Sequence, residues 1–575
     1  MNDWFVNMGI IGFMRILKKA GRYNELNIED NFIEFDSCLL ENFHKYYFNY
    51  FLERYDIYKR ESKKVDIYLQ IGKKEEKYKD AVEWIKNVVG NNRNKVKGKF
   101  EDKSIELKFN ELYSQLGKLK KHINYKQLED LVEEFKVLME TEEVNEKLTL
   151  NYFRSILSTH FFGQASFLQK GCSSKSLVEQ SAIMFKDYIK PILEEVRLYN
   201  KIEKIKDIKE FGEFIDQELK NKNNSKFYLK ILKYVKKNVL KKGIELEKIK
   251  EYLFNNFGHC SIWEEYIAST DYTEAIFIPL AVSNTNAQNF MWNLNTSYPI
   301  SNLIKFILLC SPAGTTDMKN NYFGFVNMDA SVNELYRVNE NFMSMKDEEN
   351  PFESLVYDIL SEATKKSVWT LQNILFIEFS ANYDAKNCNL KYFNIPKNIA
   401  KYFKNYSKKD LVLIYDKKFK GNLVNYILNN KDMKYLIQDK LRENIKNSYK
   451  DSYDCFLATR ARFTLKKVIK GCEEVDSSKL WVIYKSGQDL NSYFKEKESE
   501  NKIQGIAYRL LNASKSGNKK EFMDSLLRIF MAAGKEVPSL FLNVMHEKDL
   551  DFETVAHSFI SGLISNSNRE VKGDY

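Results

Sequence analysis

Helical spacing of apolar residues fills two long parts of this chain, residues 111–255 and the part after about residue 450. The clearest example is SKFYLKILKYVKKNVLKK (225–242), in which apolar side chains recur every three or four residues and lysines fill another side. The predicted apolar face consists of Tyr228, Ile231, Leu232, Val235 and Val239, and the basic face of Lys226, Lys230, Lys233, Lys237 and Lys241. The basic face is either a solvated surface or, through Lys230, Lys233 and Lys237, a nucleic-acid contact.

Turn and cap residues divide the C-terminal part into separate helices. In LLNASKSGNKKEFMDSLLRIFMAAGKEVPSLFLNVM, Asn518 is a predicted N-cap and Gly534 a predicted helix stop. Pro538 suits the first turn of the next helix, and Asp551 is placed to cap FETVAHSFISGLI. We expect a helical bundle of about four helices over residues 446–575.

Strand-like alternation is found in the first and central parts. At the N-terminus, Trp4–Leu17 predicts a helix in which Gly9 and Gly12 permit close approach of a neighbour. Strands are expected at VDIYLQI (65–71), KFEDKSIELKF (99–109), AIFIPLAVS (275–283), NILFIEFSA (373–381) and NLKYFNIP (389–396), with Lys95, Lys97 and Lys99 on a hairpin.

A chain of 575 residues is too long for one core. The predicted fold class is α+β, predominantly helical, with a large mixed N-terminal region followed by a C-terminal helical bundle. The expected domains are a mixed region at 1–110, a mainly helical region at 111–255, a mixed region at 256–445 and the bundle at 446–575.

Positive charge is concentrated in one segment. The net charge is +10, and residues 391–450 alone hold 15 basic and 5 acidic side chains. Such a surplus favours a polyanionic partner, although a Lys- and Asn-rich coding bias would also produce it. In TRARFTLKKVIKG (459–471), helical spacing predicts one stripe of Arg462, Lys466 and Lys470, and Arg460 adds a further candidate phosphate contact. A solvated face is the alternative.

The stretch NTNAQNFMWN (284–293) packs five side-chain amides around a Phe and a Trp. Amides both donate and accept hydrogen bonds, so they can read base edges or build tight turns. We take Asn284, Asn286, Gln288 and Asn289 as candidate DNA contacts. The alternative is that Asn289 and Asn293 brace a loop and Trp292 belongs to the core.

Catalytic machinery is not visible in the sequence. Phosphate-binding loops, HExxH and GxSxG motifs are missing, and the six histidines have no metal-ligand spacing. The seven cysteines form no CxxC pair, which fits free thiols in a reducing cytoplasm. We therefore expect a cytoplasmic protein that is not an enzyme and has no cofactor.

Several stretches together resemble one family. These are WFVNMGIIGFMRIL, HFFGQASFLQKG, NFMWN, LLCSPAGTT, IAYRLLNASKSGNKKEFMDSLLRIFMAAGKEVPSLFL and DFETVAHSFISGLI. In this order they resemble the large subunit of type I-B CRISPR Cascade complexes. Many members carry two CxxC pairs that bind zinc, whereas the corresponding text here reads GHCSIW and YPISNL, with Cys260 alone. We therefore expect that the zinc site is lost and that no metal is bound.

The resemblance implies a non-catalytic subunit of an RNA-guided surveillance complex. Such a subunit is expected to recognise the protospacer-adjacent motif, to contact the 5′ handle of the CRISPR RNA and the target double-stranded DNA, and to help recruit a helicase–nuclease. Its expected partners also include the backbone, handle-capping and small subunits of Cascade. In several such systems the small subunit is translated from inside the large-subunit gene, and Met433 is the only methionine between Met345 and Met523.

Two other classes of function stay open. One is a nucleic-acid-processing enzyme with an unrecognised active site, which nuclease activity of the purified protein would reveal. The other is a scaffold protein that does not bind nucleic acid, which would bind neither RNA nor DNA at low salt.

Overall fold

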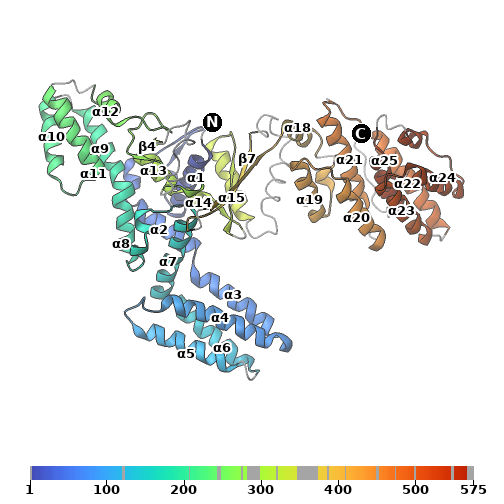
Figure 1. Cartoon of the computed structure of the whole chain (residues 1–575), viewed down its shortest axis with the longest axis horizontal. Coiled ribbons are helices and arrows are strands. Elements are labelled where there is room, and N and C mark those ends of the chain that lie inside the picture. The colour runs from blue at the N-terminus through green and yellow to red at the C-terminus, as the bar shows by residue number, and fades with distance from the viewer. Residues whose placement is uncertain are drawn as a thin grey trace. The chain divides into compact units, whose positions relative to one another are not determined.

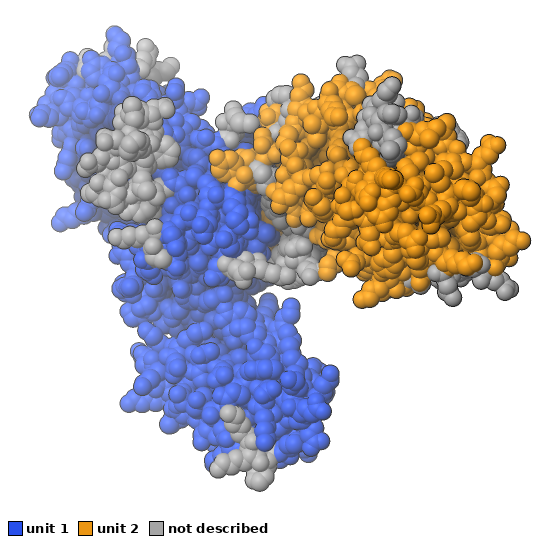
Figure 2. All heavy atoms as spheres, turned by 45° about the vertical axis from the view of Figure 1, so that its right-hand side comes forward, with its two compact units in different colours: residues 1–327, 331–336, 377–391 blue, residues 328–330, 337–376, 392–575 orange. Residues whose placement is uncertain are grey.

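The structure is a computed structural model of the chain, and helices dominate it (Figure 1). The described residues are 3–119, 123–205, 207–242, 248–273, 276–280, 298–318, 321–345, 373–384, 387–407, 410–447, 452–472, 474–497, 500–545 and 550–565. The chain divides into two compact units (Figure 2). Unit 1 holds residues 1–327, 331–336 and 377–391, and unit 2 holds 328–330, 337–376 and 392–575. The predicted α+β, predominantly helical class is confirmed.

Unit 1 begins with the predicted N-terminal helix. Helix α1 (Trp4–Lys19) is followed by a two-residue antiparallel ladder and by helix α2. The elements after α1 are η1 (Tyr23–Glu25), β1 (Asn27–Ile28), β2 (Ile33–Glu34), η2 (Ser37–Leu40) and α2 (Phe43–Arg54).

Two segments expected to be strands are helices. Val65–Ile71 belongs to α3 (Ile57–Gly72), where Val65 is buried but Ile67 is 49% exposed, so the alternate residues do not share a face. Residues 103–109 begin α5 (Lys103–Leu119), which buries Ile105 and Phe109 four residues apart and leaves Leu107 exposed. Short windows of alternating residues also fit a 3.6-residue period, and burial here follows that period.

The predicted hairpin with Lys95, Lys97 and Lys99 is therefore wrong. Lys95 lies in the last turn of α4, and α3 to α6 share one hydrophobic core with the start of α7. The remaining helices of this group are η3 (Glu75–Lys77), α4 (Tyr78–Val96) and α6 (Tyr125–Glu140).

The helical prediction for the next part is confirmed. Its elements are α7 (Glu142–His160), η4 (Ser166–Leu168), η5 (Lys170–Cys172), α8 (Leu177–Met184), η6 (Phe185–Ile189), α9 (Lys190–Lys204), α10 (Ile208–Lys220), α11 (Lys226–Tyr234), η7 (Val235–Val239), η8 (Leu240–Lys242) and α12 (Ile249–Phe257). All five residues of the predicted apolar face of 225–242 are buried in one core with α9, α10 and α12.

Two small sheets follow. One is the pair β3 (Thr270–Asp271) and β4 (Pro299–Ile300). The other has the order β5-β6-β7-β8 and confirms two of the predicted strands; its members are β5 (Thr316–Asp317), β6 (Phe323–Asn327), β7 (Leu375–Asn382) and β8 (Asn387–Asn394). AIFIPLAVS is not a strand in its described part, which contains the 3₁₀ turn η10 (Ile278–Leu280). Helices α13 (Asn302–Leu309), α14 (Ser311–Gly314) and α15 (Val332–Ser344) complete the region.

Unit 2 is helical over most of its described part. Helix α25 lies at its centre, is buried on all sides, and packs against α20, α21, α22 and α23. The elements are α18 (Lys397–Asn405), η13 (Leu411–Leu413), α19 (Lys417–Leu428), α20 (Lys434–Asn447), α21 (Ser452–Ile469), α22 (Ser478–Glu496), α23 (Glu500–Lys515), α24 (Lys519–Ala532), η14 (Ser539–Met545) and α25 (Phe552–Leu563).

The predicted helix ends of this unit are confirmed. Asn518 accepts a hydrogen bond from the Glu521 amide at the start of α24, and Asp551 accepts one from the Thr554 amide at the start of α25. Gly534 follows α24 with φ +63°. The described residues after 450 form five α-helices instead of the expected four. In the described parts of the chain, no helix combines the length and apolar character needed to cross a bilayer.

Candidate nucleic-acid interface

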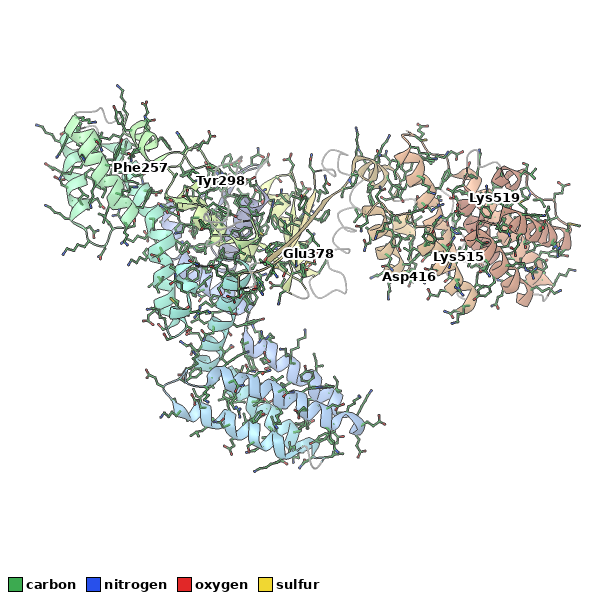
Figure 3. The ribbon with its side chains drawn as sticks, in the orientation of Figure 1. Phe257, Tyr298, Glu378, Asp416, Lys515 and Lys519 are labelled. Atoms are coloured by element: carbon green, nitrogen blue, oxygen red, sulfur yellow. The ribbon has the colours of Figure 1, made fainter. Side chains whose placement is uncertain are left out.

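Along the sequence, the amide-rich stretch falls between β3 and β4, which pair with each other as a short ladder. Thr270 pairs with Ile300 and Asp271 with Pro299, and the Tyr272 amide donates to the Tyr298 carbonyl at 2.9 Å (Tyr298 is labelled in Figure 3). The chain therefore leaves and returns at one place. The candidate DNA contacts themselves, Asn284, Asn286, Gln288 and Asn289, lie outside the described residues.

Backbone hydrogen bonds and ring contacts hold the segment beside this ladder. The Ser261 amide donates to the Pro299 carbonyl at 2.8 Å, and the preceding Cys260 is buried. The His259 ring stacks on Phe254 with centroids 4.3 Å apart, and its Nδ1 lies 2.8 Å from the Glu264 carbonyl oxygen. Where the structure describes side chains, no three His, Cys, Asp or Glu residues gather as metal ligands. That the protein binds no metal stays a prediction.

Helix α1 lies against α13 and α14 at very short distance. A Cβ on Gly12 would stand 1.9 Å from the Cys310 carbonyl oxygen, and one on Gly314 would stand 2.0 Å from the Met8 carbonyl oxygen. Any side chain at either position would force the helices apart. The two resembling stretches WFVNMGIIGFMRIL and LLCSPAGTT thus form one packing unit. The close neighbour expected at Gly12 is the segment from Cys310 to Gly314.

Two arginines bind the backbone of this packing unit. Arg15 Nη1 donates to the carbonyls of Ala313 (2.9 Å) and Thr315 (3.1 Å), and its side chain is buried within α1. Arg54, at the end of α2, donates to the carbonyls of Pro312 (2.8 Å) and Thr315 (3.0 Å) and pairs with Asp317 through Nε at 3.0 Å. These bonds satisfy carbonyls at the end of α14 that no helical turn can use.

A buried carboxyl group supports the first turn of α13. Asn302 Nδ2 donates to Glu195 Oε1 at 2.6 Å. Burial raises the pKa of Glu195 to about 8, against the opposing effect of this hydrogen bond, so the group is protonated at neutral pH. Since Asn302 lies two residues after Ile300 of β4, this contact links that end of the ladder to α9.

The stretch HFFGQASFLQKG joins the ladder region to the large sheet. Phe161 accepts a hydrogen bond from the Ile278 amide at 2.8 Å, and its ring lies 4.7 Å from that of Phe323. A Cβ on Gly163 would stand 2.2 Å from the ring of Tyr383, whose hydroxyl accepts a hydrogen bond from Gln164 at 2.8 Å. This stretch therefore contacts the turn that follows β3 and the β5-β6-β7-β8 sheet.

The lysines predicted along 225–242 form an exposed surface of α11 and η7. Lys230 lies over the ring of Phe257 (labelled in Figure 3) at 5.4 Å, and Lys233 and Lys237 are exposed. The neighbouring Lys236 pairs with Asp216 at 2.5 Å. The three candidate residues are therefore accessible to phosphate, although contact with nucleic acid stays a prediction.

The predicted stripe on α21 needs correction. Arg462 is 2% exposed and forms ion pairs with Asp432 and with Asp551, the latter at 2.8 Å. Lys466 is partly exposed and lies between the same two carboxylates at 3.2 and 3.5 Å. The helical spacing was right, but this side of α21 faces α25 and the start of α20 instead of solvent.

The other two candidates of this segment are Arg460, which lies outside the stripe, and Lys470, which ends it. Arg460 forms an ion pair with Asp410, so the carboxylate offsets the positive charge of the Arg460 guanidinium. Lys470 is exposed beyond the last turn of α21. Among these four candidates, Lys470 is the one best placed for a phosphate.

Sequence analysis missed the arginines that hold the ladder region. Arg15 had a signal, because it is the only charged residue between Asp3 and Lys18 and lies in an otherwise apolar helix. Arg54 had none, because its partners are more than 250 residues away in sequence.

A family model matches part of this chain. Residues 262–316 fit the family model Cas_CXXC_CXXC, described as a CRISPR-associated protein. The matched segment contains β3, β4, α13, α14 and the whole amide-rich stretch. Searches among curated proteins and among solved structures give no match. The segment that holds β3, β4, α13 and α14 is therefore similar to a CRISPR-associated protein family.

Proposed function

We propose that this protein is the non-catalytic large subunit of a type I-B Cascade complex and acts in the cytoplasm. The observation that carries the proposal is the coincidence of three features at one place. The family match covers the β3–β4 ladder and α13. The ladder pairs the described residues on both sides of the amide-rich stretch, and the resembling N-terminal helix packs on α13 and α14.

The ladder gives the amide-rich stretch a rigid support. Rigid elements hold recognition groups with less loss of entropy on binding than free loops do. In the proposal, Asn284, Asn286, Gln288 and Asn289 contact base edges of the protospacer-adjacent motif, where amides suit the donor and acceptor pattern of adenine.

Exposed lysines supply the remaining affinity in this proposal. Lys230, Lys233 and Lys237 of α11 would contact phosphates of the CRISPR RNA handle or of the target duplex, which fixes orientation without reading sequence. Cleavage would be left to the helicase–nuclease, and the other Cascade subunits would hold most of the guide RNA.

Reconstitution tests the proposal. The chain is expressed with and without the backbone and handle-capping subunits and a CRISPR RNA, and duplex binding is measured on a library of adjacent motifs. We expect co-purification with the RNA-containing complex and target binding that depends on both this chain and a particular motif. Binding that is equal for all motifs, or a complex that assembles and binds targets without this chain, would contradict the proposal. A nuclease assay with Mg²⁺ or Mn²⁺ on the same samples tests the enzyme alternative.

A further inference from the structure

A cleft of about 290 Å³ opens in unit 1 between the α2–α3 junction, α7 and the β5–β6 hairpin. Its size is at the lower end of the roughly 300–1,000 Å³ range of small-molecule sites. The lining residues that matter here are Tyr55, Arg60, Tyr152, His160 and Asp317. They come from three separated parts of the sequence and were not among the residues singled out above as DNA contacts.

One wall of the cleft is flat. The Arg60 guanidinium lies over the Tyr152 ring at 4.0 Å, and its Nε and Nη2 are held by Glu61 at 2.9 and 2.5 Å. The ring of Tyr55 meets that of Tyr152 edge-on with centroids 6.0 Å apart. Aromatic rings and guanidinium planes are the surfaces on which proteins stack unpaired nucleobases.

The cleft also offers hydrogen-bond acceptors. Asp317 takes one bond from Arg54 Nε at 3.0 Å and one from the Tyr55 hydroxyl at 3.1 Å, and its side chain is still 37% exposed. A carboxylate has room for about four such bonds, so acceptor capacity remains for a ligand. His160 Nδ1 lies 2.5 Å from the Ala381 carbonyl oxygen and therefore carries the proton, which makes Nε2 the acceptor in the neutral ring.

Cations stand at the border of the cleft. Lys391, whose side chain is 63% exposed, lies over the ring of the lining residue Tyr322 at 4.7 Å. Lys59, 66% exposed, lies 3.8 Å from the lining residue Asp56. A matching ligand would have a planar ring for the flat wall and two neighbouring N–H donors for Asp317. It would also carry an anionic group for the lysines at the border of the cleft.

We propose that this cleft binds one guanine nucleotide. Among the bases, guanine presents two neighbouring donors, N1–H and the N2 amino group, which one carboxylate can accept together. The base stacks on the Arg60 guanidinium, which is 29% exposed and which the Tyr152 ring supports from below. Its donor edge meets Asp317, and its phosphate lies toward Lys391 or Lys59. The nucleotide belongs either to an unpaired strand or to a free mononucleotide. The strand source rests on the proposed function, because it requires that the protein binds nucleic acid.

Fluorescence anisotropy tests the assignment on the wild-type chain. Short labelled uridine strands carry one central guanine, inosine or adenine at low salt. We expect the guanine strand to bind roughly tenfold more tightly than the inosine strand, which lacks the N2 amino group. Equal affinity for the guanine and inosine strands, together with no binding of free GMP, would overturn the proposal.

A matched pair of variants locates the effect. Tyr152→Leu removes the ring and should reduce affinity for the guanine strand roughly tenfold, whereas Tyr152→Phe keeps the ring and should bind as the wild type does. Equal binding by both variants, each folded by circular dichroism, would overturn the proposal.

Free GMP separates the two sources. If GMP binds in calorimetry and loses affinity in Tyr152→Leu, the ligand is a mononucleotide; if an excess of GMP leaves strand binding unchanged, the strand is the ligand. Binding of strands that does not depend on guanine or on Tyr152 removes the cleft assignment alone. Failure of the reconstituted complex to require this chain removes the proposed function, and GMP binding can still be judged separately.

Discussion

One oxygen of Asp551 joins two helices of unit 2. Its Oδ1 accepts a hydrogen bond from Arg462 Nη1 on α21 at 2.8 Å and another from the Thr554 amide at 3.0 Å, where it caps α25. The helix cap and the buried ion pair are therefore the same group. Burial would lower the pKa of Arg462, but the neighbouring Asp432 and Asp551 raise it, so the arginine is charged at every accessible pH.

Arg462→Met should destabilise unit 2 by about 3–5 kcal/mol, because it leaves two carboxylates facing each other with Lys466 alone between them. Urea unfolding gives the size of the loss, and hydrogen exchange in α21 and α25 gives its location. Lys470→Ala, one residue after the end of the same helix, is the control and should change stability by no more than about 0.5 kcal/mol. Equal stability of the two variants would show that Arg462 is not a structural ion pair.

Stability of unit 2 should fall below about pH 6.5 because of His557. This side chain is fully buried, and neither ring nitrogen has a partner among the described residues. Burial, and then the charge of Arg462, lower its pKa to about 3 in spite of Asp551 and Asp432, and Lys434 adds a further positive charge. The unfolded chain binds this proton near pH 6.5 and the folded chain does not until about pH 3, so acid favours unfolding throughout that window.

The slope expected from His557 is about 1.4 kcal/mol per pH unit at most. His557→Leu should remove it between pH 6.5 and 4. The loss below pH 4 should persist, since Arg462 holds the pKa of Asp432 at about 2 against the effect of burial. Hydrogen exchange in α25 is the suitable measurement, because Glu195 in unit 1, with its pKa raised to about 8, makes that unit less stable as the pH rises. An unchanged pH profile of the variant would contradict this reading.

Gly12→Ala should separate α1 from α14, because the new Cβ would stand 1.9 Å from the Cys310 carbonyl oxygen. A cost of about 1–3 kcal/mol or more is expected for such overpacking. Gly505→Ala is the control, since it lies inside helix α23 with no atom within 4 Å of the added Cβ, and it should be neutral or stabilising by up to about 1 kcal/mol. Thermal unfolding compares the two. If Gly12→Ala is as stable as Gly505→Ala, the close approach of α1 is not required.

Replacing Asn286 and Asn289 by Ala should weaken binding of the complex to targets with the correct adjacent motif by roughly 1–3 kcal/mol per lost bidentate contact. Binding to a fully single-stranded target should change little. Electrophoretic mobility shifts on both substrates measure the difference. Equal loss on the two would mean that these amides support the fold only.

Charge reversal at Lys233 and Lys237 should reduce the salt slope of nucleic-acid binding by about one unit for each phosphate contact that is lost. The matched control is Lys236→Glu on the same helical segment, because that lysine is already paired with Asp216. The slope of log Kd against log salt is read for all three proteins. A slope that stays unchanged in the double variant would leave this lysine face as solvated surface.

Local signals in the sequence predicted local structure well. The caps Asn518 and Asp551 act within three residues, so their partners can be read from the sequence. The apolar face of 225–242 was equally plain. The strands expected at 65–71 and 99–109 failed because a window of seven to eleven residues cannot separate a period of 2 from one of 3.6 when several alternate residues are apolar.

The candidate site depends on contacts that no local pattern encodes. Helical spacing correctly predicted that Arg462 shares one side of α21 with Lys466. Its ion-pair partners Asp432 and Asp551 lie 30 and 89 residues away, so no local pattern in the sequence points to them. Gly12 predicted a close neighbour of the N-terminal helix, but nothing in the sequence identified that neighbour as α14. The cleft at Tyr152 and Asp317 likewise joins residues from three parts of the chain, none of which forms a motif alone.

The position of Asp432 also bears on any shorter product of this gene. Asp432 accepts a hydrogen bond from the Lys434 amide at 3.1 Å, so it caps α20 as well as pairing with Arg462. A polypeptide that starts at Met433 would keep α20 to α25. It would lack Asp432, which is the residue immediately before its first one. Its new α-amino group would then bring positive charge to a helix N-terminus, and next to an arginine, where the full-length chain has a carboxylate. The two forms would share helices α20 to α25 and differ in electrostatics at that end. The shorter one should be less stable at low ionic strength, where the repulsion between its α-amino group and Arg462 is least screened.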